Sequence, residues 1–256
     1  MSLGGRVPYL SSIKLVPDRV TSVDQFPFNL PFVADFAIEF RSPVTFFVGE
    51  NGSGKSTVIE AIASLCGLPV GGGGKNELAA RTGADDKAPL APVLRPGFVK
   101  RPRDGYFFRA EHMSHFAELL DARRDDPDFL GDPYGRYGGR SLHTRSHGES
   151  FLALFTERLQ EGLFLMDEPE AALSPQRQLA LLARMASLVD GGRTQLIIAT
   201  HSPILLTYPG AEILSFDDGR ISSVRLEDTS HYQISRGILE SPERCWKHLR
   251  ANRDDD

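Results

Sequence analysis

Short runs of continuous apolar residues alternate along this chain with stretches in which apolar residues recur at helical spacing. Residues 44–48, 163–166 and 195–199 form three such runs, each typical of a strand buried on both faces of a sheet. Helical spacing follows over residues 58–65 and 175–189. Because buried strands that alternate with helices form parallel sheets, the pattern predicts an α/β fold with a mostly parallel core sheet flanked by helices.

The first forty residues have a different pattern, in which apolar and polar positions alternate. Residues 9–23, with a break at Pro17, and residues 34–40 are therefore predicted strands of an N-terminal antiparallel β layer. Residues 26–32 between them predict a loop, because two prolines punctuate the segment.

The other stretches are less regular. Residues 67–74 contain a run of four glycines that predicts a flexible break, and residues 75–94 predict a polar surface excursion. After them we expect, in order, a strand over 105–111, a helix over 112–123, a long loop over 124–148, a helix over 151–160, an antiparallel hairpin over 213–226, and a helical tail over 231–249 interrupted near Pro242.

Composition adds limits on partners. The chain has 256 residues, of which 41% are hydrophobic and 25% charged, so it can bury a sizeable globular core. Its formal net charge of −5 excludes a general binder of polyanions. Contact with DNA would need a local basic patch, and the small basic stretch formed by Arg95, Lys100, Arg101 and Arg103 is either such a contact or a solvated loop.

Nothing in the sequence indicates secretion or a membrane span. Cys66 and Cys245 lack metal-ligand spacing and fit a reducing cytosol. No apolar run reaches about 18 residues, and the N-terminus lacks the apolar centre of a signal peptide. We expect a cytoplasmic protein with no transmembrane segment of its own.

The segment from Gly49 to Thr57 reads G-x-x-x-x-G-K-[ST], the pattern of a phosphate-binding loop, or P-loop. It lies between a predicted strand and a predicted helix, as this motif requires. Glycines allow the backbone N–H groups to turn toward phosphate oxygens, and the helix N-terminus adds a positive end. The residues expected to bind the nucleotide are Gly49, Asn51, Gly52, Ser53, Gly54, Lys55, Ser56 and Thr57, with Lys55 reaching the β- and γ-phosphates and the Ser56 hydroxyl holding Mg²⁺.

Polar residues also follow the other two buried strands. Asp167 and Glu168 end one strand, and His201 follows the other. Ligands bind at the carboxyl ends of parallel strands, so these residues should meet the P-loop. We expect Asp167 to bind the metal, Glu168 to act as the general base toward water, and His201 to hydrogen-bond the γ-phosphate or that water. The phenylalanines of residues 26–32 either pack in the core or stack on the nucleotide base.

Four motifs together resemble those of ABC-type ATPases. They are Gly49–Thr57, Ser146-His147-Gly148-Glu149, the stretch from Leu163 to Pro175, and Ala199-Thr200-His201-Ser202-Pro203, which match the Walker A, signature, Walker B with D-loop, and H-loop elements in order. The signature is similar to that of the RecF and SMC group. The stretches Asp-Glu-Pro-Glu-Ala-Ala-Leu-Ser-Pro and Phe-Phe-Arg-Ala-Glu resemble small bacterial proteins labelled AAA-family or predicted ABC-type ATPases.

The resemblance implies one domain with ABC-ATPase architecture over residues 1–256. Residues 1–66 and 163–256 would form the nucleotide-binding core, and residues 67–162 an excursion, a strand and a small helical lobe that carries the signature. The resemblance further implies a homodimer that forms on ATP binding, in which Ser146 and Gly148 of one copy contact the nucleotide of the other. It also places a glutamine near the metal, and Glu111 stands at the corresponding position, where it could be a metal ligand.

These expectations define an enzyme, a soluble Mg²⁺-dependent ATP hydrolase with ATP and Mg²⁺ as ligands. Its sandwich dimer would be coupled to DNA maintenance or defence, with DNA or a protein as partner. Two alternatives stay open: the nucleotide-binding subunit of an ABC transporter, and an ATP-gated binding switch with little turnover.

Overall fold

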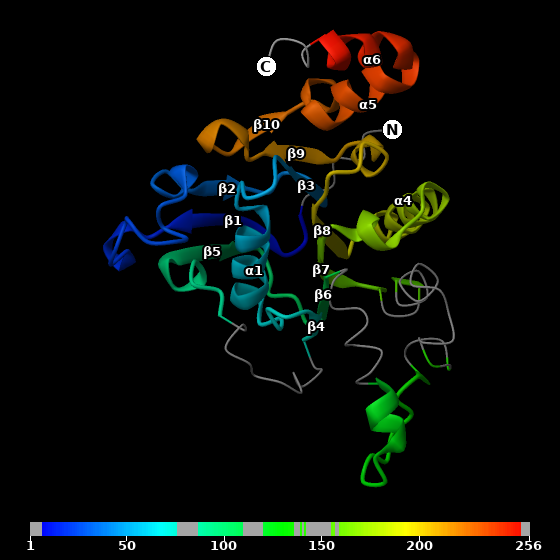
Figure 1. Cartoon of the computed structure of the whole chain (residues 1–256). Helices are drawn as coiled ribbons and strands as arrows, with labels where there is room; N and C mark the ends of the chain where they lie inside the picture. Colours follow the sequence, from blue (N-terminus) through cyan, green and yellow to red (C-terminus); the bar gives the residue numbers. More distant parts are fainter. Residues whose placement is uncertain are drawn as a thin grey trace.

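The buried apolar runs are neighbouring strands at the centre of one seven-stranded sheet. In the computed structural model, the strand order is β10-β9-β3-β8-β7-β6-β4 (Figure 1). The five strands from β9 to β6 are parallel to one another. The α/β prediction is therefore confirmed. The parallel strands are β9 (Glu212–Ser215), β3 (Val44–Val48), β8 (Thr194–Ala199), β7 (Gly162–Asp167) and β6 (Gly105–Arg109).

Two short antiparallel strands form the edges of this sheet. β10 (Ser222–Val224) pairs with β9, as the predicted hairpin requires. β4 (Gly73–Gly74) pairs with β6. The predicted flexible break over residues 67–74 is thus wrong at its end, because glycine backbone can join a ladder without any side-chain pattern to announce it.

The structure describes residues 7–75, 87–109, 120–135, 139, 141, 155–156 and 159–251. Residues 120–125 are helical, which agrees with the C-terminal part of the helix predicted over 112–123. Residues 136–138, 140 and 142–148 of the long loop predicted after it, and most of the helix predicted over 151–160, lie outside the described residues.

Each central strand faces two hydrophobic cores. On β3, Phe47 belongs to one core, whereas Phe46 and Val48 belong to the other. The first core also contains the apolar face of α1 (Lys55–Cys66), and the second contains that of α4 (Pro175–Asp190). The sheet is therefore covered on both faces, which explains why its strands appear as continuous apolar runs.

A second, three-stranded antiparallel sheet packs on the α1 side. Its order is β2-β1-β5, with β1 (Leu10–Leu15) paired to both β2 (Ala37–Glu39) and β5 (Leu94–Phe98). The predicted N-terminal β layer is present, but its third strand comes from residues 94–98. The surface excursion predicted over residues 75–94 is wrong at its end, where Leu90, Val93 and Leu94 are buried. Of the basic stretch, Arg95 lies in β5 rather than in a loop, whereas Lys100, Arg101 and Arg103 are exposed in the loop that follows.

The chain ends in two helices, α5 (Ser230–Glu240) and α6 (Pro242–Ala251), which contact each other and confirm the predicted interrupted tail (Figure 1). Of the helices described, none is both long and apolar enough to cross a bilayer. Within the described residues, the 3-10 helices are Pro17–Arg19, Pro31–Val33, Ala91–Val93, Pro169–Ala172, Leu205–Thr207, Asp217–Gly219 and Leu226–Asp228.

Candidate functional site

Parallel register brings three predicted segments to one edge of the sheet. Ala199 at the end of β8 lies opposite Phe47 of β3 on one side and opposite Asp167 of β7 on the other. The residues that follow these positions are therefore neighbours. They are the loop after Val48, the residue Glu168 and the segment that begins at Thr200.

The loop between β3 and α1 has backbone conformations that favour glycine. Gly49, Gly52 and Gly54 have φ angles of 142°, 80° and 94°. A Cβ atom on Gly54 would lie 2.8 Å from two ring carbons of Phe32, and one on Gly49 would lie 3.0 Å from Oδ1 of Asp217. The loop thus packs closely against its surroundings, and α1 begins directly after it with first-turn N–H groups that can bind an anion.

Lys55 is buried inside this loop. Its Nζ atom donates to the carbonyl oxygens of Gly49 at 2.7 Å and Glu50 at 3.0 Å. Burial lowers the pKa of Lys55, while Glu168 and Asp167 among the nearby carboxylates act in the opposite direction. The ammonium group is therefore held at the centre of the loop, where a phosphate would meet it.

Ser56 and Asp167 meet across 111 residues of sequence. The Ser56 hydroxyl donates to Oδ1 of Asp167 at 3.2 Å. Burial raises the pKa of Asp167 to about 6, although Arg109 opposes the shift. The guanidinium Nη2 of Arg109 lies 4.0 Å from Oδ2 of Asp167, and its Nη1 donates to Glu60 at 2.7 Å. One hydroxyl and one carboxylate oxygen thus lie side by side, the donor types that Mg²⁺ takes from a P-loop protein.

Glu168 and His201 form a second pair beside the loop. Oε1 of Glu168 lies 3.5 Å from Nε2 of His201. This Nε2 atom is buried and has no hydrogen-bond partner among the described residues. The Glu168 backbone is left-handed, with φ 49° and ψ 53°, and its amide donates to Ala199. Burial lowers the pKa of His201, with Lys55 the next contributor, so the imidazole is neutral near pH 7.

The predicted residues therefore form one group where the structure describes them. Lys55, Ser56, Asp167, Glu168 and His201 converge at the carboxyl edge of the sheet. Asn51, Ser53 and Thr57 belong to the same loop and first turn, and the Ser53 hydroxyl is buried without a hydrogen-bond partner in the described part of the chain. Glu111, Ser146 and Gly148 lie outside the described residues.

Two side chains to which the sequence patterns gave no role, the half-buried Glu170 and the buried Gln178, hold the histidine segment in place. Glu170 accepts from the Thr200 hydroxyl at 2.7 Å and from the His201 amide at 2.5 Å. Burial raises the pKa of Glu170, and these two hydrogen bonds oppose the rise. Gln178 of α4 accepts from the Ser202 hydroxyl at 2.5 Å. The signal for Glu170 was its place two residues after Glu168, whereas nothing in the sequence links α4 to Ser202.

The P-loop has a further partner in the C-terminal part of the chain. Oδ1 of Asp217 accepts from the amide of Glu50 at 3.0 Å, and its Oδ2 accepts from the Ser215 hydroxyl at 3.1 Å. Asp217 was expected only as a turn residue of the hairpin. It instead ties the end of β9 to the start of the P-loop.

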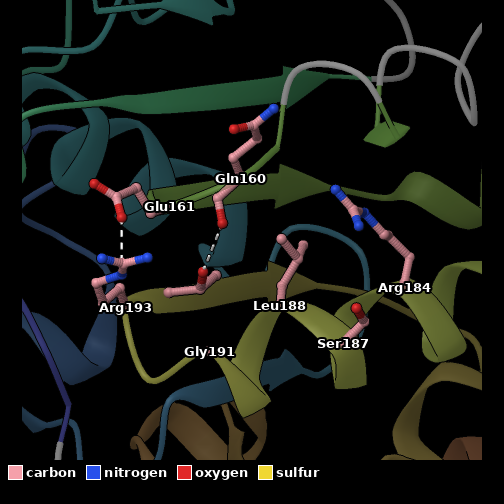
Figure 2. A pocket seen from close by; sticks show the side chains of 8 residues that line it. Gln160, Glu161, Arg184, Ser187, Leu188, Gly191 and Arg193 are labelled. Carbon is pink, nitrogen blue, oxygen red and sulfur yellow. Dashed lines mark hydrogen bonds and ion pairs between the residues drawn. The ribbon is translucent and has the colours of Figure 1, made fainter.

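A pocket of about 360 Å³ lies at the opposite edge of the sheet, near the amino ends of β7 and β8 (Figure 2). Three of its polar groups already have partners. Arg193 pairs with Glu161 at 2.8 Å, Thr194 donates to the carbonyl of Gln160 at 3.4 Å, and Arg184 donates to the carbonyl of Leu159 at 2.6 Å. The candidate phosphate-binding residues do not line this pocket.

Two family models match the two segments of the chain that contribute the residues of this site. Residues 28–86 match a family model described as an AAA domain. Residues 150–207 match a second AAA-domain model, whose description also names the AbiEii toxin of type IV toxin–antitoxin systems. The first match contains the P-loop, and the second contains Asp167, Glu168 and His201.

Curated relatives span most of the chain. A phosphonates import ATP-binding protein, PhnC 1 of Natronomonas pharaonis, is 27% identical over 71% of this chain and 81% of its own length. The molybdenum import ATP-binding protein ModC of Rhizobium meliloti is 28% identical over 75% of this chain, which covers only 56% of that protein.

A solved structure shows the same fold. The ATP-binding cassette of an ABC transporter aligns with a TM-score of 0.50 and 17% identity, over 93% of this chain and 97% of its own. Both AAA-domain segments therefore belong to one cassette fold. The residues described above lie at the carboxyl edge of its sheet, where the two segments meet. The chain thus has the fold of an ATP-binding cassette and two segments similar to AAA domains, which supports an ATP hydrolase activity.

Proposed function

We propose that this chain binds Mg·ATP at the P-loop edge and hydrolyses it with Glu168 as the general base. The observation that carries the proposal is the meeting of Ser56 with Asp167, beside Lys55 and the Glu168–His201 pair. Lys55 would bind the β- and γ-phosphates, and Glu168 would take a proton from the attacking water. His201 would donate from Nε2 to the γ-phosphate or to that water.

Two orphaned polar atoms support a triphosphate ligand. The Ser53 hydroxyl and Nε2 of His201 are buried without hydrogen-bond partners among the described residues. Phosphate oxygens would accept from both, which would remove the cost of leaving these groups unpaired. No group of three or more His, Cys, Asp or Glu residues suited to a metal occurs in the described part of the chain. Mg²⁺, when bound, would rest on Ser56, Asp167 and phosphate oxygens, and would neutralise phosphate charge.

Steady-state ATP hydrolysis tests the assignment of Glu168. We expect Glu168→Gln to lower kcat by about 100-fold or more while ATP binding is retained, because the amide cannot accept the proton. Glu161→Gln is the matched control, since that exposed carboxylate pairs with Arg193 at the opposite edge of the sheet. Full activity in Glu168→Gln would exclude Glu168 as the base. A robust activity that Glu168→Gln abolishes would also exclude a switch with little turnover.

We further propose an ATP-sandwich dimer in which Ser146 and Gly148 of one copy complete the site of the other. Mixing two inactive variants tests this arrangement. Lys55→Ala impairs phosphate binding by the P-loop of its own chain. Ser146→Arg blocks the signature motif of its own chain. A mixed dimer would keep one intact site, so we expect ATPase activity to return on mixing. If the mixture stays inactive while both variants are folded, the sites are not shared. We also propose Glu111 as a metal ligand, which like the dimer is implied by the resemblance to ABC-type ATPases.

The process coupled to hydrolysis is proposed to be DNA maintenance or defence in the cytoplasm. The toxin–antitoxin description of the matched AAA model favours defence. Salt-dependent DNA binding by ATP-loaded Glu168→Gln would support a DNA partner, and no binding at low salt would exclude it.

A transporter subunit is the second candidate, and it is favoured by the import ATP-binding proteins among the relatives. Co-purification of ATP-loaded Glu168→Gln with an integral membrane protein would support this candidate. Recovery of the variant without a membrane partner, together with DNA binding at low salt, would count against it.

A further inference from the structure

His231, in the first turn of α5, contacts the imidazole ring of His201. Nε2 of His231 lies 2.8 Å from Nδ1 of His201, and the ring centroids are 4.9 Å apart. Two ring nitrogens at this distance must share one proton, so that one nitrogen donates and the other accepts. The direction of this hydrogen bond decides which nitrogen of His201 carries a proton on its other side.

The surroundings of His201 determine that direction. Its Nε2 lies 3.5 Å from Oε1 of Glu168, and a carboxylate can only accept. A lone pair on Nε2 would face the negatively charged oxygen, whereas a proton there would be attracted to it. Burial lowers the pKa of His201, so the neutral ring carries a single proton, and that proton belongs on Nε2. Nδ1 is then an acceptor.

The second ring fits the same direction. If His231 donates from Nε2, its Nδ1 carries a lone pair. This Nδ1 is buried and has no hydrogen-bond partner among the described residues. Buried acceptors without partners occur more often than buried N–H donors without partners. The opposite direction would bury an unpaired N–H on His231 and also point a lone pair of His201 at Glu168.

We infer that His231 is a positioning residue for the hydrolysis site, donating from Nε2 to Nδ1 of His201 and holding His201 in the tautomer whose Nε2–H faces Glu168. The inference rests on the proposed role of His201 as a donor to the γ-phosphate or the attacking water. It also makes that donor depend on the placement of α5. The Thr229 side chain caps this helix by accepting from the amide of Tyr232 at 3.3 Å.

Two substitutions separate the hydrogen bond from the bulk of the ring. His231→Leu removes the donor, and His231→Gln keeps an N–H donor near the position of Nε2. We expect kcat of His231→Leu to fall about 10- to 100-fold with the KM for ATP unchanged, as for other partners that orient functional histidines. His231→Gln should regain most of the lost activity. Unchanged kcat in a folded His231→Leu protein would overturn the inference, and so would equal losses in both variants.

A spectroscopic measurement decides the tautomer without turnover. The ¹⁵N chemical shifts of the His201 ring, assigned by comparison with His201→Gln, distinguish a protonated from an unprotonated nitrogen. In the wild-type protein near pH 8 we expect Nε2 protonated and Nδ1 unprotonated, and in His231→Leu a mixture of both tautomers. A proton on Nδ1 in the wild-type protein would refute the inference. If the wild-type protein does not hydrolyse ATP, the proposed function fails, and the ring shifts still decide this hydrogen bond.

Discussion

Replacing Asp167 with asparagine should stabilise the metal-free protein at neutral pH while it abolishes ATP hydrolysis. Asp167 is 8% exposed, and burial raises its pKa from 3.8 to about 6. The folded protein therefore holds this proton more tightly than the unfolded chain does. Below about pH 4 the Asp167 carboxyl is protonated in both the folded and the unfolded state, so it does not change the free energy of unfolding. As the pH rises from there to about 6, the carboxyl lowers the free energy of unfolding.

The size of the effect follows from the width of that interval. A shift of about two pH units, at 1.36 kcal/mol for each unit, corresponds to about 3 kcal/mol of lost stability above pH 6. Asparagine stays neutral and its Oδ1 can still accept from Ser56, so the variant should escape most of this cost. We expect Asp167→Asn to match the wild-type protein near pH 4 and to exceed it by about 3 kcal/mol at pH 8.

Urea unfolding between pH 4 and pH 8 in EDTA measures this difference. Asp24→Asn is a suitable control because Asp24 is exposed. Parallel pH profiles for the wild-type protein and Asp167→Asn would refute the reasoning. A variant less stable than the wild-type protein at pH 8 would show that the Arg109 interaction outweighs burial.

Other substitutions give equally direct outcomes. Gly54→Ala should lose about 1–3 kcal/mol more stability than Gly52→Ala in denaturant unfolding, because both positions are left-handed but only a Cβ on Gly54 meets a phenylalanine ring at 2.8 Å; equal losses would show that the ring moves aside. Glu170→Ala should lower the free energy of unfolding by about 1–3 kcal/mol, since the Thr200 hydroxyl and the His201 amide lose their acceptor, and Glu170→Gln should lose less. Lys55→Ala should weaken ATP binding about 10- to 100-fold in calorimetry with little change in stability, because its partners in the folded chain are two loop carbonyls; unchanged affinity would remove Lys55 from the phosphate site.

The strongly patterned parts of this chain could be predicted from its sequence. The P-loop motif, the buried runs and the hairpin depend on local rules, and parallel strands bring their carboxyl ends together, so the contact between Ser56 and Asp167 follows from topology. Strands with weak local signals could not be found. β5 contains Pro96 and Gly97, and β4 consists of two glycines, so neither has the apolar alternation of a strand.

Long-range partners were hidden for a different reason. Glu170, Asp217 and His231 act through only one or two hydrogen bonds to distant residues. Such pairs have no periodicity and no spacing, because the fold rather than the local chain decides which polar groups meet. In the sequence, Glu170 belonged to the motif stretch after Glu168 without a role of its own, Asp217 lay in the predicted hairpin, and His231 lay in the predicted helical tail.

The anchoring of Lys55 has a consequence for the entropy of nucleotide binding. A lysine ammonium has three donors, and the carbonyls of Gly49 and Glu50 accept two of them. The third stays available to a phosphate, so the side chain can bind without abandoning either loop contact. Fixing a lysine side chain costs about 1.5–2 kcal/mol of conformational entropy. That ordering accompanies folding, and an arriving phosphate meets a preorganised cation.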